Sequence, residues 1–343
     1  MAPTSTPARR PAPLPLALTM GEPAGVGGEV TLGAWLRRDA AMPCFFVIDD
    51  AARLQSLSAR LGLKVPIERI DAPEEAVRIF PAALPVLDRP LGIEILPGKP
   101  APAAAEAVRR SIETAVALVQ QGRAGAVVTN PIHKEVLYAA GFAFPGHTEF
   151  LAALAGIATP PIMMLLCPEL RVIPVTIHVS LADALRTLTT ESIVVAAEIT
   201  AAALRSDFGI ARPRLAVAGL NPHAGEGGSM GTEEQTIIGP AIAALREKGI
   251  DATGPFPPDT LFTPRARRTY DAAICMYHDQ ALIPIKALDF DGGVNATLGL
   301  PFVRTSPDHG TALDIAGTGK AEPGSLMAAL RVAADMTANR ARS

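Results

Sequence analysis

The segment VIPVTI, residues 172–177, is an apolar run that ends directly before His178. Two similar runs follow, LAVAGL at 215–220 and AAICMY at 272–277, and each leads within a few residues to another histidine. Short runs that are apolar on both faces are typical of strands in a parallel sheet that helices cover on both sides. The three runs therefore predict strands of one buried sheet.

Four more runs of this kind lie toward the N-terminus. They are LALT at 16–19, CFFVID at 44–49, AGAVVT at 124–129 and IMMLLC at 162–167. Apolar residues recur at helical spacing in between, at 102–122, 193–204 and 237–245. Strand followed by helix, repeated along the chain, predicts an α/β fold with a largely parallel sheet and helices on both faces. At 343 residues, the chain is long enough for two lobes with a cleft between them.

The composition excludes several classes of protein. Hydrophobic residues make up 49% and charged residues 19%, which is a globular composition. Lysine and arginine number 31 against 34 aspartates and glutamates, without a run of like charges, so we expect no nucleic-acid partner. Apolar runs fall short of the 18 or more residues of a membrane span, so we expect no membrane partner.

The chain begins with MAPTSTPARRPAP, and this content of proline and alanine predicts a disordered tail over residues 1–13. The stretch PLPLALTM is too short and too rich in proline for a secretion signal, and no cleavage site follows it. Cys44, Cys167 and Cys275 lie in apolar stretches and form no CxxC pair, which argues against disulfides and a cysteine zinc site. We expect buried thiols and a cytoplasmic protein.

His178, His223 and His278 each stand at or just beyond the end of a predicted strand. Open α/β sheets bind ligands at the carboxyl ends of their strands. The three histidines are too far apart in sequence for a local metal motif, so the fold would have to assemble a shared site. Three neutral imidazoles with an open fourth position suit a catalytic divalent cation, zinc most readily. The alternative is that each histidine only makes hydrogen bonds within its own loop.

Further polar groups lie in other predicted loops. They are Asn130, His133 and Lys134 in TNPIHK, and Gly146, His147 and Thr148 in FPGHTEF. Beyond His278 come Lys286, Asn295 and Arg304, and two cations with one amide are suited to clamp a phosphate or carboxylate. The alternative for Lys286 is a solvated surface lysine, although its neighbours in IPIKAL are apolar.

Nucleotide binding is not evident from local spacing. The glycine-rich segments GEPAGVGGE at 21–29 and GTGK at 317–320 match neither G-x-G-x-x-G nor a P-loop. Pattern alone therefore supports neither an ordinary Rossmann site nor an ATPase site.

Several long motifs occur together in one order. They are GEPAGVGGEV, TNPIHKEVL, FPGHTEFLA, LNPHAGEGG with MGTEE, GPFPPDTLF, MYHDQALIPIK and GVNATLGLPFVRTSPDHGTALDIAGTGKA. On these motifs the chain resembles the 4-hydroxythreonine-4-phosphate dehydrogenase family of pyridoxal phosphate biosynthesis, over nearly its whole length after the tail. The segment DHGTALDIAGTGKAEP is also similar to the nucleotide-binding loop of isocitrate and isopropylmalate dehydrogenases, which use a metal and NAD or NADP without a Rossmann fingerprint.

The resemblance implies a two-lobed fold like that of isocitrate and isopropylmalate dehydrogenases, with the active site in the cleft between the lobes. We expect residues 14–140 and 300–343 to form the first lobe. Residues 141–299 would form the second lobe and carry the interface of a homodimer. In this family histidines of both subunits contribute to each metal site.

Carried over by motif, the resemblance implies roles for individual residues. The metal ligands would be His178, His223 and His278. The substrate contacts would be His147, Thr148, Lys286, Asn295 and Arg304. The residues on the NAD side would be His309, Gly310 and Asp314. The candidates for general acid or base are Lys286 and Asp259.

The implied reaction is oxidation of 4-(phosphooxy)-L-threonine, followed by decarboxylation to 3-amino-2-oxopropyl phosphate. It would use NAD, with NADP as the alternative, and one divalent cation per site, which is zinc, cobalt or magnesium. The cation would stabilise the alkoxide and NAD would take the hydride. The resulting β-keto acid loses carbon dioxide readily because charge can move onto the ketone oxygen.

Three other functions stay open. A dehydrogenase of the same family could oxidise another carboxylated diol, such as a dihydrodiol or a phosphorylated threonate. A three-histidine zinc hydrolase follows from the ligand set alone and would neither bind nor reduce NAD. A non-catalytic metal-binding module would give no role to the basic residues and glycine-rich loops.

Overall fold

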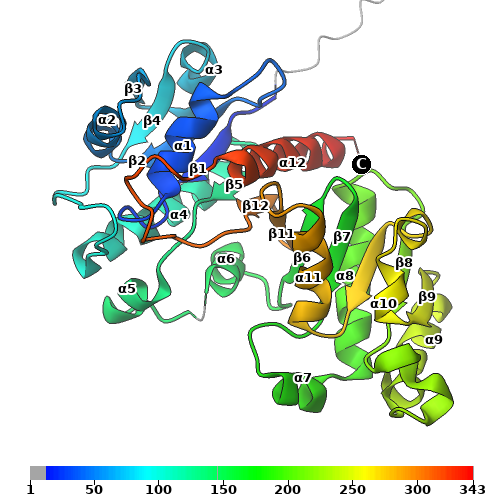
Figure 1. Cartoon of the computed structure of the whole chain (residues 1–343). Helices are drawn as coiled ribbons and strands as arrows, with labels where there is room; N and C mark the ends of the chain where they lie inside the picture. Colours follow the sequence, from blue (N-terminus) through cyan, green and yellow to red (C-terminus); the bar gives the residue numbers. More distant parts are fainter. Residues whose placement is uncertain (1–12, 145, 343) are drawn as a thin grey trace, which may run out of the picture.

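The computed structural model describes residues 13–144 and 146–342, so the predicted tail falls almost entirely outside the described residues. Its strands form one twelve-stranded sheet in the order β3-β4-β2-β1-β5-β12-β11-β6-β7-β10-β8-β9, with helices on both faces (Figure 1). The α/β fold class and the largely parallel sheet are confirmed. The lobe boundaries at 14–140, 141–299 and 300–343 stay a prediction.

The strands include all seven that the apolar runs predict. They are β1 (Leu16–Thr19), β2 (Phe45–Asp49), β3 (Ile67–Ile70), β4 (Leu84–Asp88), β5 (Val127–Thr129), β6 (Ile162–Cys167), β7 (Leu170–Pro174), β8 (Arg214–Ala218), β9 (Asp251–Phe256), β10 (Ala272–Cys275), β11 (Val294–Leu298) and β12 (Arg304–Pro307). Five strands, β3, β4, β9, β11 and β12, were not predicted. The sequences IERI of β3 and RTSP of β12 lack an apolar run because they carry charged or polar residues.

The helices include the three predicted from spacing, as α4, α8 and α9. They are α1 (Gly27–Leu36), α2 (Ala51–Arg60), α3 (Ala76–Ile79), α4 (Ala105–Gln120), α5 (Lys134–Ala139), α6 (His147–Ala155), α7 (Leu181–Thr187), α8 (Thr190–Ser206), α9 (Gly239–Glu247), α10 (Pro258–Leu261), α11 (His278–Leu288) and α12 (Gly324–Arg340). Within the described residues no single helix is long and apolar enough to cross a membrane. Helices α7 and α8 meet these criteria only when they are taken together, and the pair is bent by 92°.

The sheet joins two sets of parallel strands that run in opposite directions. One set extends from β3 to β12, and the other extends from β7 to β9. They meet through three antiparallel pairings, β12 with β11, β11 with β6 and β6 with β7. The middle of the sheet therefore holds the late strands β11 and β12 between β5 and β6, which come much earlier in the chain.

Side chains of β1 show why its sequence is apolar throughout. Leu16 and Leu18 are buried in a core cluster that also contains residues of α1 and α12. The intervening Ala17 is buried in a second cluster, with residues of α4. Because successive side chains of a strand point to opposite faces, both faces of the sheet must be covered there.

The C-terminal helix α12 returns to pack against β12 and β1 (Figure 1). Near its end, Arg340 makes two hydrogen bonds to the fully buried Asp207 that follows α8, with Nε–Oδ1 at 2.6 Å and Nη2–Oδ2 at 2.9 Å. Earlier on the same helix, Arg331 makes an ion pair with Asp39 in which both side chains are largely exposed. The helix thus carries one buried and one exposed ion pair.

We predict that Arg340→Met lowers the free energy of unfolding by about 2–3 kcal/mol, because it leaves the Asp207 carboxylate buried without its counter-charge. Arg331→Met should cost less than about 1 kcal/mol, since exposed ion pairs contribute little. Urea unfolding of both variants and of the unsubstituted protein measures the difference. Equal decreases in the free energy of unfolding of the two variants would show that burial of the Arg340–Asp207 pair does not increase its contribution to stability.

Candidate active site

A cavity of about 740 Å³ lies over the middle of the sheet. Its floor includes Asn295 of β11 and Arg304 and Ser306 of β12, which share one face because alternate residues of paired strands point the same way. Its walls come from the segments that follow β5, β7 and β10, together with the start of α6 and one side of α11. The antiparallel junction thus places residues from distant parts of the chain around one space.

Arg304 is a buried cation that has no carboxylate partner among the described residues. It is 4% exposed, its Nη1 donates to Oγ1 of Thr297 at 2.9 Å, and its Nη2 donates to Oγ1 of Thr129 at 2.6 Å. In the part of the chain that the structure describes, its Nε is buried without a partner. Burial lowers the pKa of Arg304 to about 10, so the group is still charged at neutral pH. A buried charge of this kind is typical of an anion-binding site.

His147, the first residue of α6, is buried beside this guanidinium. Burial lowers its pKa well below the usual range, and the charges of Arg304 and Lys134 lower it further, so the imidazole is neutral. Among the described residues, neither Nε2 of His147 nor Oδ1 of Asn295 has a hydrogen-bond partner. Buried polar atoms are normally paired, so these two atoms indicate a ligand that completes the site.

Lys286 lies in the cavity wall on α11. Its Nζ is 2.9 Å from Oδ2 of Asp308, which follows β12, and it also donates to the carbonyl oxygen of Asp308 at 3.4 Å. The side chain is about one-third exposed. The structure therefore favours the cavity position of Lys286 over the alternative of a solvated surface lysine.

His178 and His278 face each other at one end of the cavity, with ring centroids 5.9 Å apart. They follow β7 and β10, which are parallel neighbours in the sheet. Nδ1 of His278 is 2.7 Å from Oδ1 of Asp279, which orients the ring and leaves Nε2 available. Desolvation lowers the pKa of His178, and the nearby Lys134 and His278 lower it further, which favours the neutral form that binds metals.

The geometry of this pair fits two ligands of one divalent cation. Zinc–nitrogen distances of about 2.0–2.1 Å place the centroids of two ligating imidazoles roughly 5–6 Å apart. The observed separation of 5.9 Å agrees with that range. His178 also has a φ of 52°, a left-handed conformation that is uncommon for a residue other than glycine and concentrates at functional sites.

His223 does not join this pair within one chain. It lies after β8 in the segment Pro222–Gly228, it is exposed, and it is not part of the cavity lining. Within residues 13–144 and 146–342, no three histidine, cysteine, aspartate or glutamate side chains converge to hold a metal ion. One chain therefore brings together two of the three predicted metal ligands.

The other predicted site residues divide into two groups. The cavity lining contains Thr148, His309 and Gly310. Asp314 and Asp259 are exposed and lie outside the lining of this cavity. Sequence reasoning missed Thr129, Thr297 and Asp308, which hold the two cationic side chains in place. A threonine at the end of an apolar run is a weak signal, since it also suits a buried strand.

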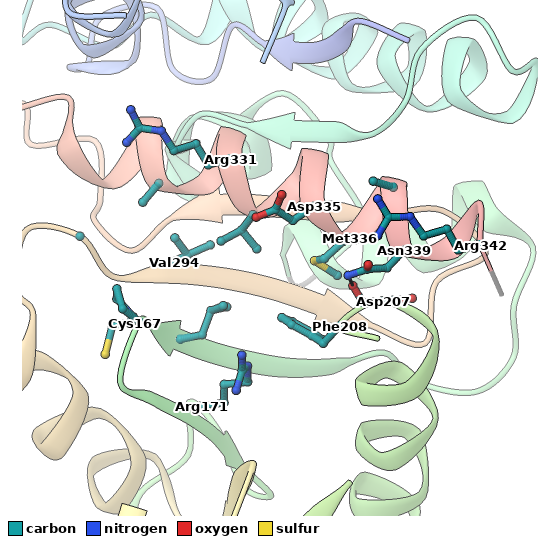
Figure 2. A pocket seen from close by; sticks show the side chains of 16 residues that line it. Cys167, Arg171, Asp207, Phe208, Val294, Arg331, Asp335, Met336, Asn339 and Arg342 are labelled. Atoms are coloured by element: carbon teal, nitrogen blue, oxygen red, sulfur yellow. Dashed lines mark hydrogen bonds between the residues drawn. The ribbon is translucent and has the colours of Figure 1, made fainter. Parts of the chain in front are cut away.

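Figure 2 shows a second cavity, of about 550 Å³, between α12 and the strands β6 and β7. Two of its charged side chains are already paired, Asp207 with Arg340 and Arg331 with Asp39. None of its described lining residues is a histidine. The cavity over the middle of the sheet is therefore the candidate active site.

Comparison with known proteins agrees with this geometry. The family model for the pyridoxal phosphate biosynthetic protein PdxA matches residues 41–333. A 4-hydroxythreonine-4-phosphate dehydrogenase of Bradyrhizobium diazoefficiens is 57% identical over 336 residues, which cover 94% of this chain and 97% of that protein. One of the same name from Caulobacter vibrioides is 55% identical over 333 residues, with 95% and 98% covered.

A solved structure of the same name, from Klebsiella pneumoniae, is 41% identical and has a TM-score of 0.85. The similarity covers 94% of this chain and 99% of that one. The resemblance inferred from the sequence motifs is thereby confirmed. The chain belongs to the PdxA family of pyridoxal phosphate biosynthetic proteins.

Proposed function

We propose that this protein oxidises 4-(phosphooxy)-L-threonine with NAD and a divalent cation, and that decarboxylation to 3-amino-2-oxopropyl phosphate follows. The observation that carries the proposal is one cavity that contains both an uncompensated buried guanidinium and a facing pair of histidines. The similarity to proteins named 4-hydroxythreonine-4-phosphate dehydrogenase supports the same activity.

The anionic ends of the substrate match the basic side chains of the cavity. Arg304 and Lys286 would hold its phosphate and carboxylate groups, because they line the same space and are fixed by Thr129, Thr297 and Asp308. His147, Thr148 and Asn295 would supply uncharged hydrogen-bonding groups. The unpaired Nε2 of His147 and Oδ1 of Asn295 would gain their partners from the substrate.

His178 and His278 would hold the cation, which is zinc, cobalt or magnesium. We place His223 of a second copy of the chain as the third ligand, in a homodimer whose sites are shared between subunits. When bound, the cation supplies positive charge that lowers the pKa of a coordinated hydroxyl and stabilises the oxygen anion. Asp279 would accept a hydrogen bond from Nδ1 of His278 and so keep the ring in the tautomer whose Nε2 is free to bind the cation.

NAD, with NADP as the alternative, would lie along His309, Gly310 and Asp314 and accept the hydride. The segment that follows is held by Glu29, which accepts hydrogen bonds from the backbone N–H groups of Gly317 at 2.9 Å and Ala321 at 3.0 Å. These bonds attach it to the glycine-rich stretch near the N-terminus. Such anchoring would fix the position of a bound dinucleotide relative to the substrate.

Lys286 is the better supported candidate for the general acid or base. Its Nζ lies in the cavity wall, 2.9 Å from Oδ2 of Asp308. Asp259 lies outside the cavity of its own chain, so a role for it would require the second copy.

The direct test is NADH formation from 4-(phosphooxy)-L-threonine and NAD, with and without a chelator. We expect turnover that the chelator abolishes and that zinc, cobalt or magnesium restores. His223→Ala should lose metal retention and NADH formation together, whereas the control His133→Asn should keep both, since His133 does not line the cavity. Full turnover by metal-free His223→Ala protein would refute the proposal.

Parallel assays with an aromatic dihydrodiol and a phosphorylated threonate address the other members of this enzyme class. A preference for either diol would replace the proposed substrate. Hydrolysis without any binding of NAD would instead indicate the three-histidine zinc hydrolase.

Arg304→Met provides a second prediction, in which activity and stability change in opposite directions. Removal of the anion-binding charge should lower kcat/KM by about 100-fold or more, from the loss of charge-assisted hydrogen bonds to the substrate. The same variant should match or exceed the thermal midpoint of the unsubstituted protein, because a buried charge without a counter-ion is unfavourable. Steady-state kinetics and calorimetry of the ligand-free protein measure the two effects.

Arg304→Lys is the matched control. It keeps the charge but replaces the two donor nitrogens of the guanidinium with a single nitrogen, so we expect reduced activity without a rise in the thermal midpoint. A marked loss of stability in Arg304→Met would mean that the guanidinium supports the fold rather than a ligand.

A further inference from the structure

The turn that carries His223 has an unusual backbone. Five consecutive residues from His223 to Gly227 have positive φ, with values of 52°, 51°, 76°, 40° and 67°. Three of the five are not glycines, and each such residue in this conformation costs on the order of 1–2 kcal/mol. A left-handed run of this length persists only where surrounding contacts determine it.

Those contacts converge on Glu234, which is 5% exposed. Its Oε1 accepts hydrogen bonds from the backbone N–H groups of Leu220 at 2.8 Å and Asn221 at 2.7 Å. Its Oε2 accepts one from Nδ2 of Asn221 at 2.9 Å. One buried carboxylate therefore fixes the two residues through which the chain leaves β8 and enters the turn.

The turn itself packs on the same carboxylate. A Cβ atom added to Gly225 would lie 2.6 Å from Oε2 of Glu234, and one added to Gly219 would lie 3.2 Å from Oε1. Gly225 also accepts a hydrogen bond from the backbone N–H of Met230 at 3.2 Å, which closes the turn. The glycines thus allow the backbone on both sides of His223 to reach Glu234.

The donor and acceptor roles in this hydrogen-bond network are determined by its members. Nδ2 of Asn221 donates to Oε2 of Glu233 at 2.8 Å as well as to Glu234, so both of its hydrogens are used. An amide in place of the Glu234 carboxylate could still accept from the backbone with its oxygen, but its NH₂ group would then face the NH₂ group of Asn221. Two donors in contact at a buried site leave both unsatisfied.

We propose that Glu234 is the positioning residue for His223, since its carboxylate holds the left-handed turn in the form that presents this imidazole to the cation shared with a second subunit. The inference rests on the proposed metal role of His223. It adds a residue that lies outside the cavity and touches neither substrate nor cation.

The test compares cobalt binding by full-length Glu234→Gln with binding by the unsubstituted protein. We expect cobalt affinity, measured by competition with a chelator, to fall by about 10-fold or more, as for other residues that orient metal ligands. The visible absorption bands of bound cobalt should change as the ligand geometry is disturbed. Hydrogen exchange at the Leu220 and Asn221 amides should accelerate without added metal.

Two variants serve as controls. Glu233→Gln keeps an oxygen that can accept from Asn221, so its cobalt affinity should stay within about threefold of the unsubstituted value. Asp207→Asn removes a buried carboxylate that pairs with Arg340 of α12 and reports on general destabilisation. If Glu234→Gln does not fold, Glu234→Asp replaces it, because the shorter carboxylate cannot reach all three donors and should also weaken cobalt binding.

Unchanged cobalt affinity in the Glu234 variants would overturn the inference, as would an equal loss in Asp207→Asn. Equal cobalt binding by His223→Ala and the unsubstituted protein would overturn the metal role of His223 itself, and with it both proposals. A failure seen only in the Glu234 and Asp207 variants leaves the proposed reaction unaffected, whereas normal cobalt binding by His223→Ala contradicts the proposed reaction as well. The two failures are therefore distinguishable.

Discussion

The pairing of β11 with β12 on one side and with β6 on the other joins two sets of parallel strands into one sheet. Both pairings are antiparallel, so polar residues of β11 and β12 face the same space as the loops beyond β5, β7 and β10. The candidate site depends on this join, because residues from separate stretches between Thr129 and Gly310 line one cavity only through it.

The electrostatic character of that cavity depends on which of its cationic side chains have a carboxylate beside them. Lys286 has Asp308 beside it, whereas Arg304 is held by threonine hydroxyls. Lys134 adds a third cation to the lining, and burial, together with the charges of Arg304 and Lys134, lowers the pKa of His147 and keeps it neutral. The cavity lining thus carries three cations against the two carboxylates of Asp308 and Glu149, together with uncharged hydrogen-bonding groups, and this excess of positive charge suits a small anionic ligand. The neutral form of His178, which burial favours, suits metal binding.

Much of the fold was predictable from apolar runs, since buried strands need apolar residues on both faces. β12 was not, because a strand that begins with a buried arginine has no apolar pattern, and arginine is rarely buried. The convergence of His178 and His278 was predictable because both follow strands of a parallel set. His223 also follows such a strand, but a left-handed turn redirects it, and residues such as Ala224 and Glu226 give no sign of positive φ in the sequence. Arg304 was noted in the sequence as one of two cations in the stretch after His278, and the family motifs then implied that it contacts the substrate.

The central place of β12 also has a consequence for biosynthesis. This strand lies between β5 and β11, yet it comes after both of them, and after β6 to β10, along the chain. A nascent polypeptide emerging from the ribosome can pair β1 with β2 and β5 early, but the edge of β5 stays open until Arg304–Pro307 has been synthesised. Formation of the central sheet, and with it the pocket around Arg304, is therefore a late event dominated by contacts between distant segments, which are slow to form.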